Sequence, residues 1–105
     1  MPQFTVNRNK NPQTLSAVPF LLDVQSDLLS DLETRVVVPL SPVSAMKGMA
    51  LRTLMPVLEI EGERFVMLTP QMAGIPKSEL GTPVTRVEQY RFEIIAAIDF
   101  LLTGI

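Results

Sequence analysis

The fold is decided by the C-terminal stretch, residues 85–105, which reads TRVEQYRFEIIAAIDFLLTGI and is the clearest long helical pattern in the chain. Thr85 with Glu88 three residues later has the form of a capping box, in which two side chains satisfy backbone N–H groups at a helix start. Successive helical residues are about 100° apart, so apolar residues at the right spacing share one face. That face carries Val87, Ile94, Ile98, Leu101 and Ile105. The sequence therefore predicts a helix over 85–105 that packs one stripe against a core.

Two groups of apolar residues do not fit a fold with a single core. Phe92 and Phe100 project toward the polar side of the predicted helix, where a monomer would place Lys or Glu. The polar connection 27–34 also carries leucines at positions 28, 29 and 32. Exposed apolar residues rimmed by polar ones mark interaction sites. We therefore expect a second contact surface; the alternative is that the two phenylalanines pack under a loop.

The remainder of the chain predicts about five short strands. Alternating or β-branched apolar runs fall at 4–6, 20–26, 35–40 and 57–68, and the last is the plainest hairpin because its two strands flank a turn with Gly62. So small a sheet must curl to hide its edges, and a terminal helix can cover it. The predicted fold class is mainly β with a C-terminal α-helix, in a single domain over 1–105.

The connections carry weaker patterns. Residues 7–19 and 71–83 are interpreted as loops and turns, because prolines, asparagines and glycines are frequent there. Residues 41–55 do not alternate strictly and contain three methionines, so we interpret them as irregular, with a short turn of helix as an alternative.

Composition restricts the location and the partners of the protein. Hydrophobic residues make up 47% of the chain and charged residues 19%, which is typical of an ordered globular domain. No apolar run approaches the roughly 20 residues needed to span a bilayer, and no basic region followed by an apolar segment opens the chain. The net charge of −2 argues against a nucleic-acid partner. We expect a cytoplasmic protein that binds other proteins, with no membrane contact and no direct nucleic-acid binding.

Residue usage also restricts the chemistry. The chain has no cysteine and no histidine, which excludes thiolate sites and removes the commonest general base and metal ligand. Asp23, Asp27 and Asp31 at four-residue spacing could hold a metal on a helix, but we interpret them as solvated surface carboxylates. Arg35 could serve a histidine-free nuclease, although such an arginine more often pairs with a nearby carboxylate. We expect no metal, no cofactor and no catalysis.

Five short motifs follow one another along the chain. They are Leu22-Asp23-Val24-Gln25-Ser26-Asp27-Leu28, Val38-Pro39-Leu40, Pro56-Val57, Met72-Ala73 before Ile75-Pro76, and Gly104-Ile105. Together they resemble the CcdB family, the toxins of CcdA/CcdB toxin–antitoxin modules, over nearly the whole chain. The resemblance implies a homodimer of small SH3-like barrels of the plasmid maintenance toxin type. It also implies a toxin that binds the A subunit of DNA gyrase, traps the cleaved DNA complex and is neutralised by the antitoxin CcdA.

The resemblance further implies a gyrase-binding surface. It consists of Ser26, Leu28, Leu29, Asp99, Thr103, Gly104 and Ile105, with Gln3 and Phe4 nearby. Members of the family commonly carry tryptophan before the final Gly-Ile, suited to stacking on an arginine of gyrase, and Thr103 cannot supply that contact. Asp99 stands where the better-known relatives have an amide.

The other two interfaces involve different residues. We expect Leu101 and Ile105 to lie near the twofold axis of the dimer. The antitoxin should meet exposed basic residues, for which the candidates are Arg8, Lys10, Lys47 and Arg52.

Two other functions stay open at this point. The same barrel superfamily includes RNA-cleaving toxins, so an endoribonuclease is one alternative, although it needs a basic groove and an acid–base pair. The second alternative is a non-toxic remnant that has lost gyrase affinity through Thr103 and still binds its antitoxin.

Overall fold

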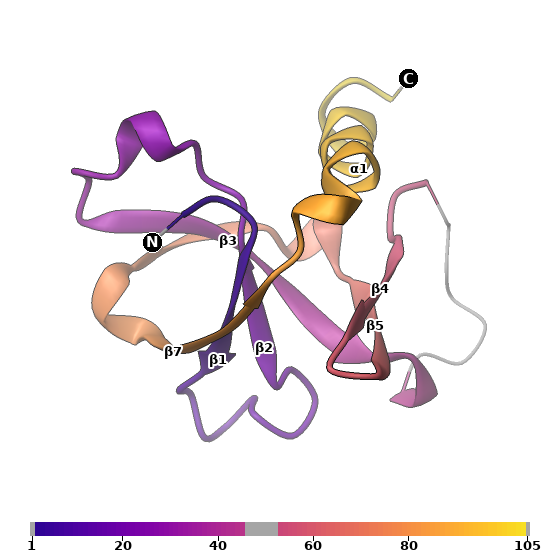
Figure 1. The fold of residues 1–105 in the computed structure, drawn as a ribbon, viewed down its shortest axis with the longest axis horizontal. Helices are drawn as coiled ribbons and strands as arrows, with labels where there is room; N and C mark the ends of the chain where they lie inside the picture. The colour runs from indigo at the N-terminus through magenta and orange to yellow at the C-terminus, as the bar shows by residue number, and fades with distance from the viewer. Residues whose placement is uncertain (1, 46–52, 105) are drawn as a thin grey trace.

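The computed structural model describes residues 2–45 and 53–104, which form a curled antiparallel sheet with one helix packed against it (Figure 1). The strands are β1 (Thr5–Asn9), β2 (Phe20–Asp23), β3 (Thr34–Pro42), β4 (Val57–Ile60), β5 (Glu63–Met67), β6 (Ala73–Pro76) and β7 (Leu80–Arg86). The α-helix is α1 (Arg91–Thr103). Short 3₁₀ helices join these elements: η1 (Asp27–Leu29), η2 (Val43–Ala45), η3 (Thr69–Gln71), η4 (Lys77–Glu79) and η5 (Glu88–Tyr90). The predicted fold class, mainly β with a C-terminal helix, is confirmed.

The sheet curls because its longest strand, β3, is shared by two partners along one edge. The strand order is β4-β5-β3-β2-β1-β7, and β6 also pairs with β3. Residues 34–37 of β3 pair with β6, whereas residues 40–42 pair with β5. The other edge of β3 pairs with β2. The two halves of β3 therefore lead into two differently directed parts of the sheet, as in a small SH3-like barrel.

The core lies on the concave side of this sheet, under α1. Its buried members are Phe4, Val6, Phe20, Leu22, Val24, Val38, Leu40, Leu58, Ile60, Phe65, Met67, Val87, Ile94 and Ala97. Core residues alternate along β2, β3, β4 and β5, as expected for a sheet with one buried face. Phe20 and Phe65 meet edge to face with ring centroids 5.1 Å apart, which joins β2 to β5 at the centre.

The predicted start of the helix is wrong. Thr85 belongs to β7 and pairs with Val6 of β1, so it does not cap a helix. Glu88 opens η5 and forms an ion pair with Arg86. The α-helix begins only at Arg91, because pairing with β1 holds the chain extended as far as Arg86 and the 3₁₀ turn η5 follows. The apparent capping box therefore spans the end of a strand.

The apolar stripe of the helix reaches the core only in its first half. Ile94 and Ala97 are buried and Ile98 is half-buried, whereas Leu101 is 36% exposed. Ile105 lies outside the described residues. The last turns of α1 extend beyond the sheet, as the upper part of Figure 1 shows.

Other boundaries also differ from the prediction. The turn-rich segment 71–83 contains β6 and part of β7, because Pro76 and Pro83 lie at positions of these short strands where proline is tolerated. The first strand runs on to Asn9, and the second ends at Asp23. The predicted hairpin at 57–68 is confirmed as β4 and β5 around a two-residue turn.

Candidate partner-binding surface

The first part of the candidate surface is the η1 segment, which projects from the sheet after β2. The segment 27–34 has no buried residue, and Leu28 is 94% exposed. Leu29 and Leu32 are each 49% exposed. The hydroxyl of Ser26 accepts a hydrogen bond from the Leu28 N–H at 3.1 Å and caps η1. The expectation of exposed leucines is confirmed, and Ser26 lies beside them.

A buried ion pair lies under this segment. Arg35 Nε donates to Asp23 Oδ2 at 2.7 Å, and Arg35 Nη2 donates to Asp23 Oδ1 at 2.9 Å. Both residues have no exposed surface. The interpretation of Asp23 as a solvated carboxylate is therefore wrong, whereas Asp27 and Asp31 are exposed. The pairing expected for Arg35 is confirmed, and its burial keeps the guanidinium away from any RNA phosphate.

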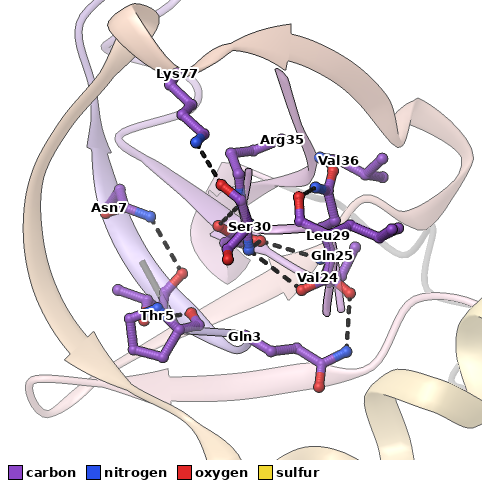
Figure 2. A network of polar contacts seen from close by, with 12 residues as sticks. Gln3, Thr5, Asn7, Val24, Gln25, Leu29, Ser30, Arg35, Val36 and Lys77 are labelled. Carbon is purple, nitrogen blue, oxygen red and sulfur yellow. Dashed lines mark hydrogen bonds and ion pairs between the residues drawn. The ribbon is translucent and has the colours of Figure 1, made fainter. Parts of the chain in front are cut away.

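Gln25 connects the ion pair to the η1 segment (Figure 2). Its backbone carbonyl accepts from Arg35 Nη2 at 3.2 Å, and its N–H donates to Asp23 Oδ1 at 3.0 Å. Its side chain donates to the Leu29 carbonyl at 3.0 Å and accepts from the Val36 N–H at 3.0 Å. The backbone of the exposed Leu29 is thus hydrogen-bonded to a buried polar network.

The N-terminal residues link the η1 segment to the helix. The Gln3 N–H donates to Asp27 Oδ1 at 2.7 Å, and Gln3 Nε2 donates to the Val24 carbonyl at 3.1 Å. Phe4 is 1% exposed and belongs to the core, so it lies beside the predicted surface without being part of it. Its ring lies 5.5 Å from the guanidinium of Arg91, at the start of α1.

The second part of the candidate surface is the outer face of α1. Phe92 is 82% exposed and Leu102 is 70% exposed. Asp99 and Thr103 are also exposed, and the Thr103 hydroxyl donates to the Asp99 carbonyl at 2.7 Å. A shallow cleft of about 350 Å³ follows this face from Arg91 to Asp99. Phe92 does not pack under a loop. Of the two interpretations of this residue, its exposure therefore favours a contact surface.

The helix ends in the conformation that glycine favours. Gly104 has φ +74°, and its N–H donates to the Phe100 carbonyl at 2.9 Å. This left-handed end turns the chain away from the helix axis after Thr103. The predicted contact residue Ile105 lies outside the described residues.

The structure brings the predicted gyrase-binding residues together in two separate groups. One group contains Gln3, Ser26, Leu28 and Leu29, and the other contains Asp99, Thr103 and Gly104. In Figure 1, η1 and α1 stand on opposite sides of the N-terminal segment. The first group is an exposed apolar patch with polar neighbours, whereas the second is polar and lies on the helix that also exposes Phe92 and Leu102. Exposed apolar side chains beside polar ones are typical of a protein contact surface.

The basic residues proposed for the antitoxin lie at the other end of β1. The Arg8 guanidinium lies 5.9 Å from the centre of the Phe20 ring, and Lys10 Nζ donates to the Ser78 carbonyl at 2.7 Å. Both residues are exposed and line an open cleft with Leu80, Gly81 and Thr82. The other two candidates, Lys47 and Arg52, lie outside the described residues.

Two other kinds of site are absent from the described ranges 2–45 and 53–104. Groups of three or more Asp and Glu side chains placed to hold a metal ion do not occur there. Nor does that part of the chain contain a helix long and apolar enough to cross a membrane.

Sequence comparison assigns the family. Residues 3–104 match the family model described as CcdB protein. The chain belongs to the CcdB family. It is therefore a toxin of the toxin–antitoxin kind, and its curled sheet with one C-terminal helix agrees with the fold of that family.

Sequence reasoning missed the residues of this CcdB chain that support the η1 segment. Asp23 and Gln25 alternate with Leu22 and Val24, and strict alternation assigns them to the solvent face. A signal was nevertheless present, because an arginine within a β-branched run requires a buried carboxylate partner. Asp23 is a carboxylate in the neighbouring strand.

Proposed function

We propose that this CcdB-family toxin binds the A subunit of DNA gyrase and traps the gyrase complex with cleaved DNA. It acts by binding, without catalysis of its own, and in the cytoplasm, where its target lies. The observation that carries the proposal is Leu28, a leucine that is 94% exposed on a segment whose backbone is fixed by hydrogen bonds. An exposed apolar side chain on an ordered backbone loses little conformational entropy on binding. Such a side chain can therefore contribute a large part of the binding free energy.

The outer face of α1 supplies the second half of the proposed contact. Thr103 cannot provide the large apolar contact of a tryptophan, and its hydroxyl is already bonded to the Asp99 carbonyl. Leu102 and Phe92 are the large exposed side chains on the same helix, at 70% and 82% exposure. We assign the compensating apolar contact to these two residues.

A homodimer forms part of the proposal. The η1 group and the α1 group lie apart in one chain, so a target that contacts both requires either a wide footprint or two protomers. Leu101 is 36% exposed on the last turns of α1, beyond the sheet. Covering it against a second copy would remove apolar surface from water. Sedimentation at micromolar concentration tests this point, and a monomer would contradict it.

The antitoxin CcdA is the proposed neutralising partner. Arg8 and Lys10 offer two exposed positive charges beside a cleft, which suits an acidic extended segment. This surface lies at the opposite end of β1 from the η1 segment (Figure 1). Loss of CcdA binding in an Arg8→Glu, Lys10→Glu double variant would support the assignment, and unchanged binding would contradict it.

Titration calorimetry against the dimerisation region of the gyrase A subunit tests the proposed target. The intact protein is compared with Leu28→Glu and with Leu15→Glu, because Leu15 is also exposed, at 45%, in the loop between β1 and β2. We expect Leu28→Glu to weaken binding by about 30-fold or more, as for a hot-spot side chain, and Leu15→Glu to bind like the intact protein. Absence of binding by the intact protein would contradict the proposal and favour the non-toxic remnant.

An RNA assay on the same preparation addresses the endoribonuclease alternative. The dimer is incubated with labelled RNA in the absence of gyrase. We expect intact RNA, and specific cleavage that survives further purification would overturn the binding-only mechanism.

A further inference from the structure

The η1 segment is ordered without a core of its own. Residues 27–34 are all exposed, and a surface segment without buried side chains gains little from packing. Fixing such a backbone opposes its conformational entropy. Its order therefore rests on hydrogen bonds, both the local bonds of the 3₁₀ turn and those that reach it from the rest of the fold.

Two side chains supply such bonds to successive carbonyl groups. Gln25 Nε2 donates to the Leu29 carbonyl at 3.0 Å, and Lys77 Nζ donates to the Ser30 carbonyl at 2.5 Å. The backbone of Lys77 also donates to the Glu33 carbonyl at 2.9 Å. Figure 2 shows Lys77 reaching Ser30 from one side while Gln25 contacts Leu29 from another. Leu29 and Ser30, the two residues after the exposed Leu28, are thus both held by hydrogen bonds to their carbonyl groups.

The two side chains differ in what else they support. Gln25 is 5% exposed and also bonds Val36, so removing it would disturb the sheet as well as the segment. Lys77 is exposed on η4, and its side chain donates a hydrogen bond to the carbonyl of Ser30, 47 residues away in the sequence. Because the donor is charged, this bond is stronger than one between neutral groups. A substitution that removes the amine would therefore remove this contact with the segment and leave the bonds of the core in place.

We propose that Lys77 is a positioning residue for target binding, which fixes the η1 segment through the Ser30 carbonyl so that Leu28 and Leu29 are presented in one arrangement. This inference rests on the proposed gyrase-binding function. The benefit to binding is preorganisation. Because the segment is already ordered in the free protein, less conformational entropy is lost when the complex forms.

The test compares Lys77→Met with Arg64→Met. Both variants lose one positive charge from an exposed position, but Arg64 lies on β5, opposite Glu59 in the hairpin. Two quantities are measured on the full chain: amide hydrogen exchange of residues 28–33, and affinity for the gyrase A dimerisation region. A third variant, Lys77→Arg, retains the charge and a donor at the same place.

We expect Lys77→Met to speed exchange within 28–33 and to weaken gyrase binding, each by about fivefold to tenfold, the equivalent of one solvent-exposed hydrogen bond. Core amides in β2 and β3 should exchange as in the intact protein. Arg64→Met should change neither quantity, and Lys77→Arg should restore most of both.

Unchanged exchange in Lys77→Met would overturn the positioning role, because the segment would then be ordered without this bond. Faster exchange with unchanged affinity would overturn the link to binding. If the intact protein does not bind gyrase, the proposed function fails, while the exchange measurement still decides whether Lys77 fixes the segment.

Discussion

Arg35 Nε lies 2.7 Å from Asp23 Oδ2, and both side chains are completely buried between β2 and β3. Two bonds join the guanidinium to the carboxylate, and a third joins it to the Gln25 carbonyl at the base of the η1 segment. The pair therefore connects the stability of the sheet to the order of the surface that carries Leu28.

Asp23→Asn should destabilise the protein strongly. The substitution retains the shape of the side chain but leaves the Arg35 charge buried without its carboxylate, for which a loss of about 3–5 kcal/mol is usual. Urea unfolding measures the change. Asp31→Asn is the control, because Asp31 is exposed and should change the free energy of unfolding by less than about 0.5 kcal/mol. Equal effects of the two substitutions would contradict the role of the pair.

Gly81→Ala should destabilise the pairing of β1 with β7. A Cβ added at Gly81 would lie 2.6 Å from the Arg8 carbonyl oxygen, so one of the two strands must move. We expect a loss of about 1–3 kcal/mol, as for other overpacked sites. Gly74→Ala is the matched control, since a Cβ there meets nothing within 4 Å. Thermal unfolding of both variants checks the prediction, which fails if Gly81→Ala unfolds with the midpoint of the intact protein.

Glu61→Asn should stabilise the hairpin of β4 and β5. The turn has φ +53° at Glu61 and +81° at Gly62, and positive φ at both central residues is the pattern of a type I′ turn, which favours Asn-Gly. Glu61 is exposed, so the change affects few contacts. We expect a gain of about 0.5–1 kcal/mol in the free energy of unfolding, measured with urea. A loss of stability would show that Glu61 makes a contribution beyond the turn.

Thr103→Trp should strengthen gyrase binding. The position is exposed at the end of α1, and an indole there could stack on an arginine of the target. A gain of about tenfold in affinity is expected for one added aromatic contact. Gln89→Trp is the control for non-specific adhesion, since Gln89 is exposed on η5. Equal gains in the two variants, measured by calorimetry, would exclude a specific contact at position 103.

The fold class could be predicted from sequence because its strongest signals are local. The hairpin at 57–68 alternates around a glycine turn, and the β-branched run at 35–40 forms the middle of β3. The helix start could not be predicted, because Thr85 is held in β7 by pairing with Val6, a contact between residues far apart in sequence. A local capping pattern contains no information about such long-range strand pairing.

The exposure of the leucines after β2 could be predicted from the sequence, but the bonds that order them could not. The sequence places Leu28 and Leu29 in a polar connection, which predicts their exposure, and both are exposed. The bonds that order them come from Gln25 and Lys77. Lys77 is 47 residues from its acceptor, so only the folded chain reveals the connection.

The most direct test of the central claim is the trapping of cleaved DNA by purified gyrase. Gyrase, ATP and supercoiled plasmid are incubated with the intact toxin or with Leu28→Glu, and linear DNA is quantified after denaturation of the protein. The proposed mechanism predicts that linear DNA accumulates with the intact toxin and stays at the background level with Leu28→Glu. Background levels of linear DNA with the intact toxin, at concentrations that saturate its binding to gyrase, would contradict the claim.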